Sequence, residues 1–261
     1  MPAPRPKILH QSLRANRANR FIYLNNAKVG CSTVKASLWA AITGSPPAKI
    51  GNVHVLEGSP FDNDIRKLDW AADAFIFTFV RNPHARLVSA YLNKVLPPRD
   101  RVWPEFATRH GLDPDRPIGF DAFVEFISGI PPEAHDPHWR PQHINTLHPF
   151  VTPNFVGDLD RMDTLLPDLL ARLLPGRIAG SVARRQHGTG AGDSYRSHLT
   201  DPGTVARMQR LYAGDFELFG YDPDPARDPA PLAETRLRPH RHPRLARLAR
   251  QRRQRKDAAP G

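Results

Sequence analysis

The chain has 261 residues, of which 40% are hydrophobic, so it is long and apolar enough for one well-packed α/β domain with a tail. Cys31 is the only cysteine, which excludes an intrachain disulfide and a zinc site built from several thiolates. Because the first 20 residues lack the apolar core of a signal peptide and no stretch approaches the ~20 apolar residues of a membrane span, we expect a cytoplasmic protein, at most peripheral to a membrane.

The net charge of +11 indicates anionic partners, although the charge is unevenly distributed. Residues 222–261 contain eleven Lys or Arg and five Asp or Glu. Their net charge of +6 (11 − 5) is more than half of the net charge of the chain. The rest of the chain is mildly basic, as expected of a protein that handles phosphate or sulfate. Charge alone does not assign a function.

The first strand is predicted at Phe21–Leu24, a short apolar run rich in β-forming residues. Residues 1–20 are rich in proline and arginine and predict a flexible arm ahead of it. Residues 28–33 then form a compact loop, and the spacing of apolar side chains predicts a helix from Thr33 to about Ile42.

The loop between this strand and this helix predicts a phosphate cradle. The first N–H groups of a helix lack intrahelical partners, and the helix dipole favours negative charge there. Lys28, Ser32, Thr33 and Lys35 add side-chain donors at the same place. The loop differs from the Walker sequence, because its lysine precedes Gly30 instead of following a second glycine. An ordinary strand-to-helix turn with an incidental lysine is the alternative.

A second strand-loop-helix unit is centred on Arg81. The strand before it, residues 74–80, is nearly continuously apolar, as in the covered centre of a parallel sheet. Asn82 suits the N-cap of a helix predicted at 84–94. Arg81 would lie at the carboxyl end of its strand, where open α/β sheets bind ligands, and Ser89 two turns along the helix could hold the same phosphate. The alternative is that Arg81 pairs with a nearby carboxylate.

Between these two units we expect a short strand at 52–56, which carries His54, and a helix at 64–73. The elements expected after the second unit are a proline-punctuated insertion at 97–117, an amphipathic helix at 120–127, a strand at 155–157, a helix at 162–174, a polar glycine-rich segment at 188–199 and a helix at 202–215. Residues 222–261 are of low complexity, and we expect a disordered basic tail with a short helix around Leu245 and Leu248.

Four histidines lie close together in the sequence, at His135, His138, His143 and His148. Imidazole is the commonest zinc ligand, so this cluster raises the hypothesis of a metal site. The prolines in the segment prevent a regular helix, and no H-E-x-x-H pair is present. We therefore expect no metal.

These elements predict a P-loop-like three-layer α/β/α fold with a central, mostly parallel sheet, irregular proline-rich insertions and a disordered basic tail. The expected domain spans residues 21–221, between the arm at 1–20 and the tail at 222–261. Two phosphate-directed units about fifty residues apart, one with lysine and one with arginine and serine, indicate a nucleotide that carries phosphate at both ends.

This pairing resembles the sulfotransferases that use 3′-phosphoadenosine 5′-phosphosulfate (PAPS). More narrowly, it is similar to the carbohydrate sulfotransferase group that includes the HNK-1 and chondroitin/dermatan 4-O enzymes. The segments that carry the resemblance are KVGCSTVK, VRNPHARLVSAYLNK, DPHWRPQ, NFVGDLDRMD and YRSHLTD followed by DFELFGY. The group usually has proline before the loop lysine, where this chain has Ala27.

The resemblance implies a set of site residues. Lys28 would contact the sulfate-bearing phosphate and the leaving oxygen. Val29, Gly30, Cys31, Ser32, Thr33 and Lys35 would line the same loop. Arg81 and Ser89 would hold the 3′-phosphate, and Arg196 or Ser197 would close over the cofactor.

Transfer of a sulfuryl group also needs a base for the acceptor hydroxyl, which we expect on a saccharide or glycolipid. His54 is the preferred candidate, with His138 and Trp139 shaping the acceptor pocket, and His138 is the second candidate. A structural role is the alternative for each histidine. Two other functions stay open: a nucleotide-dependent kinase or NTPase, and a non-catalytic binder of an anionic polymer or surface through the Arg-rich tail. No specific nucleic acid is expected.

Overall fold

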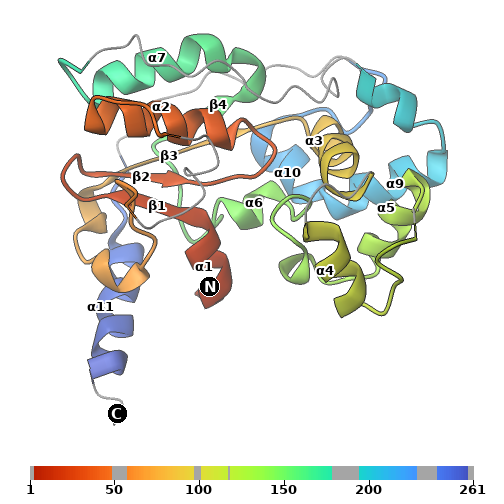
Figure 1. Ribbon diagram of the computed structural model, residues 1–261, viewed down its shortest axis with the longest axis horizontal. Helices are drawn as coiled ribbons and strands as arrows, with labels where there is room; N and C mark the ends of the chain where they lie inside the picture. Colours follow the sequence, from red (N-terminus) through yellow and green to blue (C-terminus); the bar gives the residue numbers. More distant parts are fainter. Residues whose placement is uncertain are drawn as a thin grey trace.

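The structure is a computed structural model that describes residues 3–48, 58–96, 101–116, 118–177, 194–227 and 240–257. Its centre is a four-stranded sheet in the order β1-β2-β3-β4 (Figure 1). The strands are β1 (Leu13–Asn16), β2 (Phe21–Leu24), β3 (Phe75–Val80) and β4 (Phe155–Asp158). β2, β3 and β4 run parallel, and β1 is antiparallel to β2. The mostly parallel sheet predicted from the sequence is confirmed.

Alternation along β2 explains why this strand is buried on both faces. Phe21 and Tyr23 point to one side of the sheet, where Phe77 of β3 packs with them. Ile22 and Leu24 point to the other side and join a separate apolar cluster. Parallel strands covered on both faces are expected to be apolar throughout.

Helices cover both faces of the sheet, which gives the three layers expected (Figure 1). On one face lie α2 (Cys31–Thr43) and α7 (Met162–Leu173), whose apolar residues share a cluster with Phe21, Tyr23 and Phe77. On the other face lie α1 (Pro6–Ser12), the 3₁₀ turns η2 (Ile65–Lys67) and η3 (Ala71–Asp73), and α11 (Pro243–Asp257).

A helical lobe adjoins the sheet at the end where β3 leads into α3 (Figure 1). Its elements are α3 (Pro83–Ala90), the π-helical turn η4 (Tyr91–Val95), α4 (Val102–Arg109), α5 (Phe120–Ser128), η8 (Tyr195–His198), α9 (Pro202–Leu211) and α10 (Ala213–Phe219). The short elements η5 (Pro132–Ala134) and α6 (Gln142–Asn145) lie between α5 and β4 in the chain, and η6 (Leu159–Arg161) joins β4 to α7. The lobe has its own core of aromatic and aliphatic side chains.

The expectation of a flexible arm at 1–20 is wrong for most of that segment. Ile8 and Leu9 of α1 are buried, and β1 extends the sheet by pairing Leu13 with Leu24 and Asn16 with Phe21. The apolar side chains of this segment are few, but they are spaced to face one side of the sheet. The arginine and proline content concealed that spacing.

The expectation of a disordered tail is wrong for residues 240–257. The helix expected around Leu245 and Leu248 is α11, and both leucines are buried against the sheet's second face. The His242 N–H donates to the Ala72 carbonyl at 2.7 Å and fixes the start of this helix.

Two other boundaries differ from the prediction. The helix expected at 64–73 is the pair of turns η2 and η3. The helix expected at 202–215 is broken at Tyr212 into α9 and α10. The strand expected at 52–56 lies outside the described residues. No helix in the described part of the chain is long and apolar enough to cross a membrane.

Candidate active site

The two predicted phosphate-directed loops lie at the same edge of the sheet. β2 and β3 are parallel, with Tyr23 opposite Phe77, so their carboxyl ends lead into adjacent loops. The loop after β2 carries Lys28, and the residue directly after β3 is Arg81. Clefts at this edge are where open parallel sheets bind ligands.

The Lys28 loop turns sharply into α2. Lys28 and Gly30 have φ of 68° and 71°, a left-handed conformation that a residue without a Cβ adopts most readily. At Gly30 a Cβ would also lie 2.8 Å from Met162 Sδ, so a larger residue would displace the end of that methionine side chain. Gly30 is the N-cap of α2 and supplies no side-chain cap to the first N–H groups of that helix. The turn thus directs the start of a 13-residue helix toward the loop.

Cations gather around this loop. Burial, and after it the charges of Lys94, Arg81 and Arg86, lower the pKa of Lys28 to about 8. Burial likewise lowers the pKa of Lys35 to about 8. No carboxylate in the described part of the chain forms an ion pair with Lys28. The cations repel one another, and a bound anion with several charges would relieve that repulsion.

Arg81 and Ser89 both lie on the α3 unit and both are buried. Asn82 caps α3 as predicted, because its Oδ1 accepts hydrogen bonds from the N–H groups of His84 (2.9 Å) and Ala85 (3.2 Å). Pro83 occupies the first helical position, where its missing N–H is not needed. The cap fixes where α3 starts and therefore where Arg81 and Ser89 lie relative to β3.

Gln142 connects the two loops, a role that sequence analysis did not assign. Its side chain accepts from the Arg81 N–H (3.0 Å) and donates to the Arg81 carbonyl (2.7 Å). The same Oε1 accepts from Asn26 Nδ2 at 3.1 Å, and Asn26 also donates to the Phe79 carbonyl. All of these groups are buried. The segment before Lys28 and the segment at Arg81 are therefore held in one hydrogen-bond network.

Arg86 makes a second connection that sequence analysis missed. Its guanidinium is 1% exposed and donates to three carbonyls, those of Ala27, Arg140 and Pro137, each at 2.9 Å. Ala27 precedes Lys28, and Pro137 precedes His138. One buried guanidinium thus places the lysine loop beside the histidine loop. The sequence offered one signal for Arg86, which is its position between Asn82 and Ser89, about one helical turn from each.

His138 has the surroundings of a proton acceptor. Its Nδ1 donates to Asp136 Oδ1 at 2.5 Å, which leaves Nε2 directed away from that carboxylate. The side chain is 25% exposed. The pKa of Asp136 is lowered in spite of burial, because His138 hydrogen-bonds its charged form. A carboxylate that fixes one ring nitrogen orients the other for proton transfer.

The other predicted cluster members are dispersed. His135 is buried and its Nε2 donates to the Ile127 and Ile130 carbonyls. His143 pairs through Nδ1 with the buried Asp215, whose carboxylate also accepts the Gln142 and His143 N–H groups and so caps α6. Within the described residues, no three His, Cys, Asp or Glu side chains are arranged to hold a metal ion.

Trp139 does not shape an open pocket, contrary to the sequence-based expectation. It is fully buried in the lobe, with its ring 4.8 Å from Phe106 and 5.6 Å from Phe123. Its carbonyl accepts a hydrogen bond from the Tyr212 hydroxyl at 2.7 Å. The large apolar side chain fits a core of aromatic rings, which the motif alone did not reveal.

Arg196 and Ser197 lie on η8, which packs against α3. Both residues are exposed to solvent. Arg196 donates to the Pro225 carbonyl (2.7 Å) and the Arg227 carbonyl (3.2 Å), and Ser197 donates to the Ser194 carbonyl. They are thus beside the helix that carries Ser89. His54 lies outside the described residues.

Comparison with known proteins gives one family and three related proteins. The model of the sulfotransferase family matches residues 11–222. Carbohydrate sulfotransferase 14 of Danio rerio is 28% identical over 82% of this chain, and the proteins of that name from Homo sapiens and Mus musculus are 26% and 25% identical over 85%. The match covers 63% of each relative's length. No solved structure matches significantly.

Proposed function

The chain belongs to the sulfotransferase family, and on this premise we propose that it transfers a sulfuryl group from PAPS to a hydroxyl of a saccharide. The observation that carries the proposal is the cluster of cations around Lys28, at the edge where Arg81 also emerges. The three relatives, each named a carbohydrate sulfotransferase, support a saccharide as the acceptor.

The residues present suit a donor with phosphate at both ends. Lys28, the N-terminus of α2 and the side chains of Ser32, Thr33 and Lys35 hold the phosphosulfate end in our proposal. Arg81 and Ser89 hold the 3′-phosphate, since an arginine fork and a hydroxyl suit its oxygens. Arg196 and Ser197 close the site from η8.

When bound, PAPS supplies a sulfuryl group on a phosphate that departs as adenosine 3′,5′-bisphosphate. The acceptor oxygen forms the new S–O bond as the bond between sulfur and the phosphate oxygen breaks. The protonated Lys28 stabilises the negative charge that develops on the departing oxygen. The buried Gln142 and Arg86 contacts keep the two loops in place, so that little reorganisation is needed during transfer.

The acceptor hydroxyl must lose its proton as it attacks. Among the described histidines we assign this role to His138, because Asp136 fixes its ring and Arg86 ties its loop to the loop of Lys28. The proton passes to His138 Nε2, and Asp136 stabilises the resulting imidazolium. His54 stays the second candidate for the base.

Binding of adenosine 3′,5′-bisphosphate tests the proposal directly. Calorimetry on the intact protein is expected to show binding that weakens at least tenfold, about 1.4 kcal/mol, in Lys28→Ala and in Arg81→Ala. Arg101→Ala, an exposed arginine on the lobe, is the matched control and is expected to bind normally. Transfer of labelled sulfate to a panel of glycans then identifies the acceptor. Absence of nucleotide binding by the unmodified protein would overturn the proposal.

A further inference from the structure

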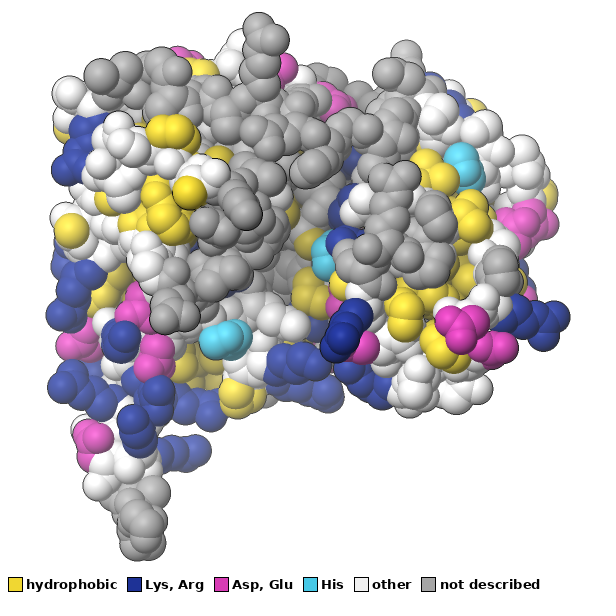
Figure 2. All heavy atoms as spheres, in the orientation of Figure 1, with side chains coloured by type: hydrophobic (Ala, Val, Ile, Leu, Met, Phe, Trp, Pro, Cys, Tyr) yellow, Lys and Arg dark blue, Asp and Glu magenta, His cyan; other side chains and the backbone are white. Residues whose placement is uncertain are grey.

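The C-terminal helix α11 is a strongly basic element outside the family match, which ends at residue 222. Its 15 residues include seven Lys or Arg and a single acidic residue, Asp257. Figure 1 shows that its C-terminal part extends beyond the rest of the fold. In Figure 2, Lys and Arg side chains gather over this helix at the lower left of the molecule.

The helix presents a row of arginines to solvent on the side that faces away from the sheet. Leu245, Ala246, Leu248 and Ala249 are buried against the sheet's second face. The opposite side carries exposed arginines, namely Arg244, Arg247, Arg250 and Arg255. None of these four forms an ion pair with a described carboxylate. Arg244 and Arg255 are eleven residues apart, so the row is about 16 Å long.

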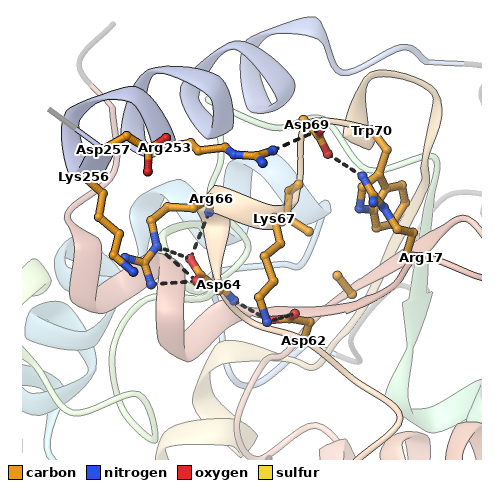
Figure 3. Close-up of a pocket in the computed structure, with 12 residues that line it drawn as sticks. Arg17, Asp62, Asp64, Arg66, Lys67, Asp69, Trp70, Arg253, Lys256 and Asp257 are labelled. Carbon is orange, nitrogen blue, oxygen red and sulfur yellow. Dashed lines mark hydrogen bonds and ion pairs between the residues drawn. The ribbon is translucent and has the colours of Figure 1, made fainter.

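A pocket whose charges are largely paired lies beside the C-terminal part of the helix (Figure 3). This pocket has a volume of about 430 Å³ and lies between α11 and residues 62–70. Three of its carboxylates form ion pairs with cations from the same part of the fold: Asp62 with Lys67 (2.8 Å), Asp64 with Arg66 (2.7 Å) and Asp69 with Arg17 (2.6 Å). Those carboxylates are therefore engaged beneath α11, while the arginine row faces outward.

We propose that this arginine row is a binding surface for an acidic polysaccharide, one that bears carboxylate or sulfate groups along its length. The assignment rests on the proposed function, which makes a saccharide the acceptor. A row of guanidinium groups that form no ion pair with a described carboxylate complements a linear chain of anions, because each arginine can hold a carboxylate or sulfate with two N–H groups. The surface retains the chain and takes no part in sulfuryl transfer.

The position of the row favours a polymer over a small ligand. α11 packs on η2 and η3, and η3 immediately precedes β3, so the helix lies at the amino end of that strand. Lys28 and Arg81 lie at the carboxyl end of the sheet. The six residues of β3 separate the two regions by about 20 Å. Only an extended ligand could occupy both.

The burial of the helix argues against a lipid surface as the partner. A helix that binds in the membrane interface inserts its apolar face among the lipids. In this protein the apolar face of α11 is already packed against the domain core. The exposed side offers charge without an apolar anchor, which suits a hydrated polyanion.

The test is equilibrium binding of a labelled heparin dodecasaccharide to the intact protein at about 50 to 300 mM salt, measured by fluorescence anisotropy. The substitutions are Arg244→Gln, Arg247→Gln, Arg250→Gln and Arg255→Gln, made together. Affinity is expected to fall about tenfold or more, with a shallower salt dependence, because four exposed ion pairs are lost. The matched control removes four exposed arginines elsewhere, by Arg101→Gln, Arg109→Gln, Arg116→Gln and Arg172→Gln, and is expected to bind normally.

Two further measurements separate this inference from the proposed function. Exchange of the four α11 arginines for lysine keeps the charge but loses the paired N–H contacts, and it is expected to weaken heparin binding less than the four glutamine substitutions do. Adenosine 3′,5′-bisphosphate should bind equally to the unmodified protein and to the four-glutamine variant, which also shows that the variant is folded. If the unmodified protein does not bind the nucleotide, the transferase proposal is overturned. The identification of a polysaccharide as the ligand of the arginine row is then overturned with it. Unchanged heparin affinity in the four-glutamine variant, or tighter row-dependent binding of duplex DNA or of anionic vesicles, would overturn the inference alone.

Discussion

At the scale of single residues, Lys28 combines two demands that oppose each other. It must be protonated to attract an anion, yet burial and neighbouring cations favour its neutral form. With a pKa of about 8, Lys28 is mostly protonated at neutral pH and loses its proton as the pH rises above 8. The pH dependence of anion binding should therefore report on this side chain.

We expect the affinity for adenosine 3′,5′-bisphosphate to be constant below the Lys28 pKa of about 8 and to fall as pH rises through it, by up to about tenfold per unit. The sign follows because the bound anion favours the protonated lysine, so binding is coupled to proton uptake above that pKa. Calorimetry between about pH 6.5 and 9.5 measures it. In Lys28→Arg the charge persists and the profile should flatten, apart from a residual contribution from Lys35. A constant affinity up to pH 9.5 in the unmodified protein contradicts the assignment.

The base can be identified by separating turnover from binding. His138→Gln should lower kcat by about 10² or more and leave the affinity for adenosine 3′,5′-bisphosphate unchanged, because only proton transfer is lost. Asp136→Asn should lower kcat less, since it removes the orientation of the ring and not the ring itself. His54→Gln is assayed in parallel. Should that variant alone lose kcat, the base is His54 and His138 has a structural role.

Residue identity in the sequence was enough to predict where Lys28 and Arg81 lie, after the ends of β2 and β3, and to predict the cap at Asn82. Each of these combines a charged or capping side chain with a strand end, and both signals are local. Arg86 and Gln142 could not be assigned in this way, because their partners lie about 50 to 60 residues away and are mostly backbone carbonyls. A carbonyl has no signature in the sequence. Long-range contacts of this kind become visible only in the fold.

At the scale of elements, Arg86 ties α3 to two loops. Its three carbonyl partners belong to the lysine loop and the histidine loop; the contacts to Ala27 and Arg140 are buried and the contact to Pro137 is partly buried. Replacing the guanidinium with an apolar side chain would leave these acceptors without their donor. Such acceptors are costly, because they lose their hydrogen bonds to water as well.

We expect Arg86→Met to lower the free energy of unfolding by about 3 kcal/mol in urea denaturation. Nucleotide binding should weaken as well, since the Lys28 loop loses its support. Arg101→Met removes an exposed arginine and should change stability by less than about 0.5 kcal/mol. A stable Arg86→Met protein would show that water or another side chain satisfies these carbonyls.

The elements differed in how clearly the sequence defined them. Continuous apolar runs predicted β2 and β3, and apolar periodicity predicted α2 and α5, because each of these elements buries several apolar side chains of its own. Apolar patterning did not predict α1, where Ile8 and Leu9 stand among basic residues and prolines. It indicated α11 only as a short helix around Leu245 and Leu248, inside a tail that we expected to be disordered. The overall composition of these helices reflects their solvent-exposed residues. Their structure depends instead on the tertiary contacts of a few buried apolar side chains.

At the scale of the whole molecule, the C-terminal segment joins the fold at the sheet itself. Asn154 pairs with Ile76 of β3 through its backbone N–H and through Oδ1. The same Oδ1 accepts from His242 Nε2 at 2.9 Å, and Asn154 Nδ2 donates to the His240 carbonyl. The start of α11 is therefore fastened to the junction of β3 and β4 by one asparagine and one histidine.

This fastening makes the stability of the protein depend on pH. Burial, followed by the charge of His240, lowers the pKa of His242 to about 4, so the folded protein holds this imidazole neutral. In the unfolded chain the pKa is about 6.5, and below that value the unfolded state takes up the proton first. The contribution of His242 to stability is complete above pH 6.5 and declines as pH falls toward 4. We expect the loss to be about 2 kcal/mol at pH 4.5.

Urea denaturation at a series of pH values measures this dependence, and His242→Gln isolates it. Glutamine keeps a donor for Asn154 and does not titrate, so the variant should lose less stability than the unmodified protein between pH 7 and pH 4.5. Carboxylates and other histidines titrate equally in both proteins, and the difference between the two curves therefore belongs to His242. Parallel curves would mean that His242 is already exposed to water when the chain is folded, and that α11 is held by its leucines alone.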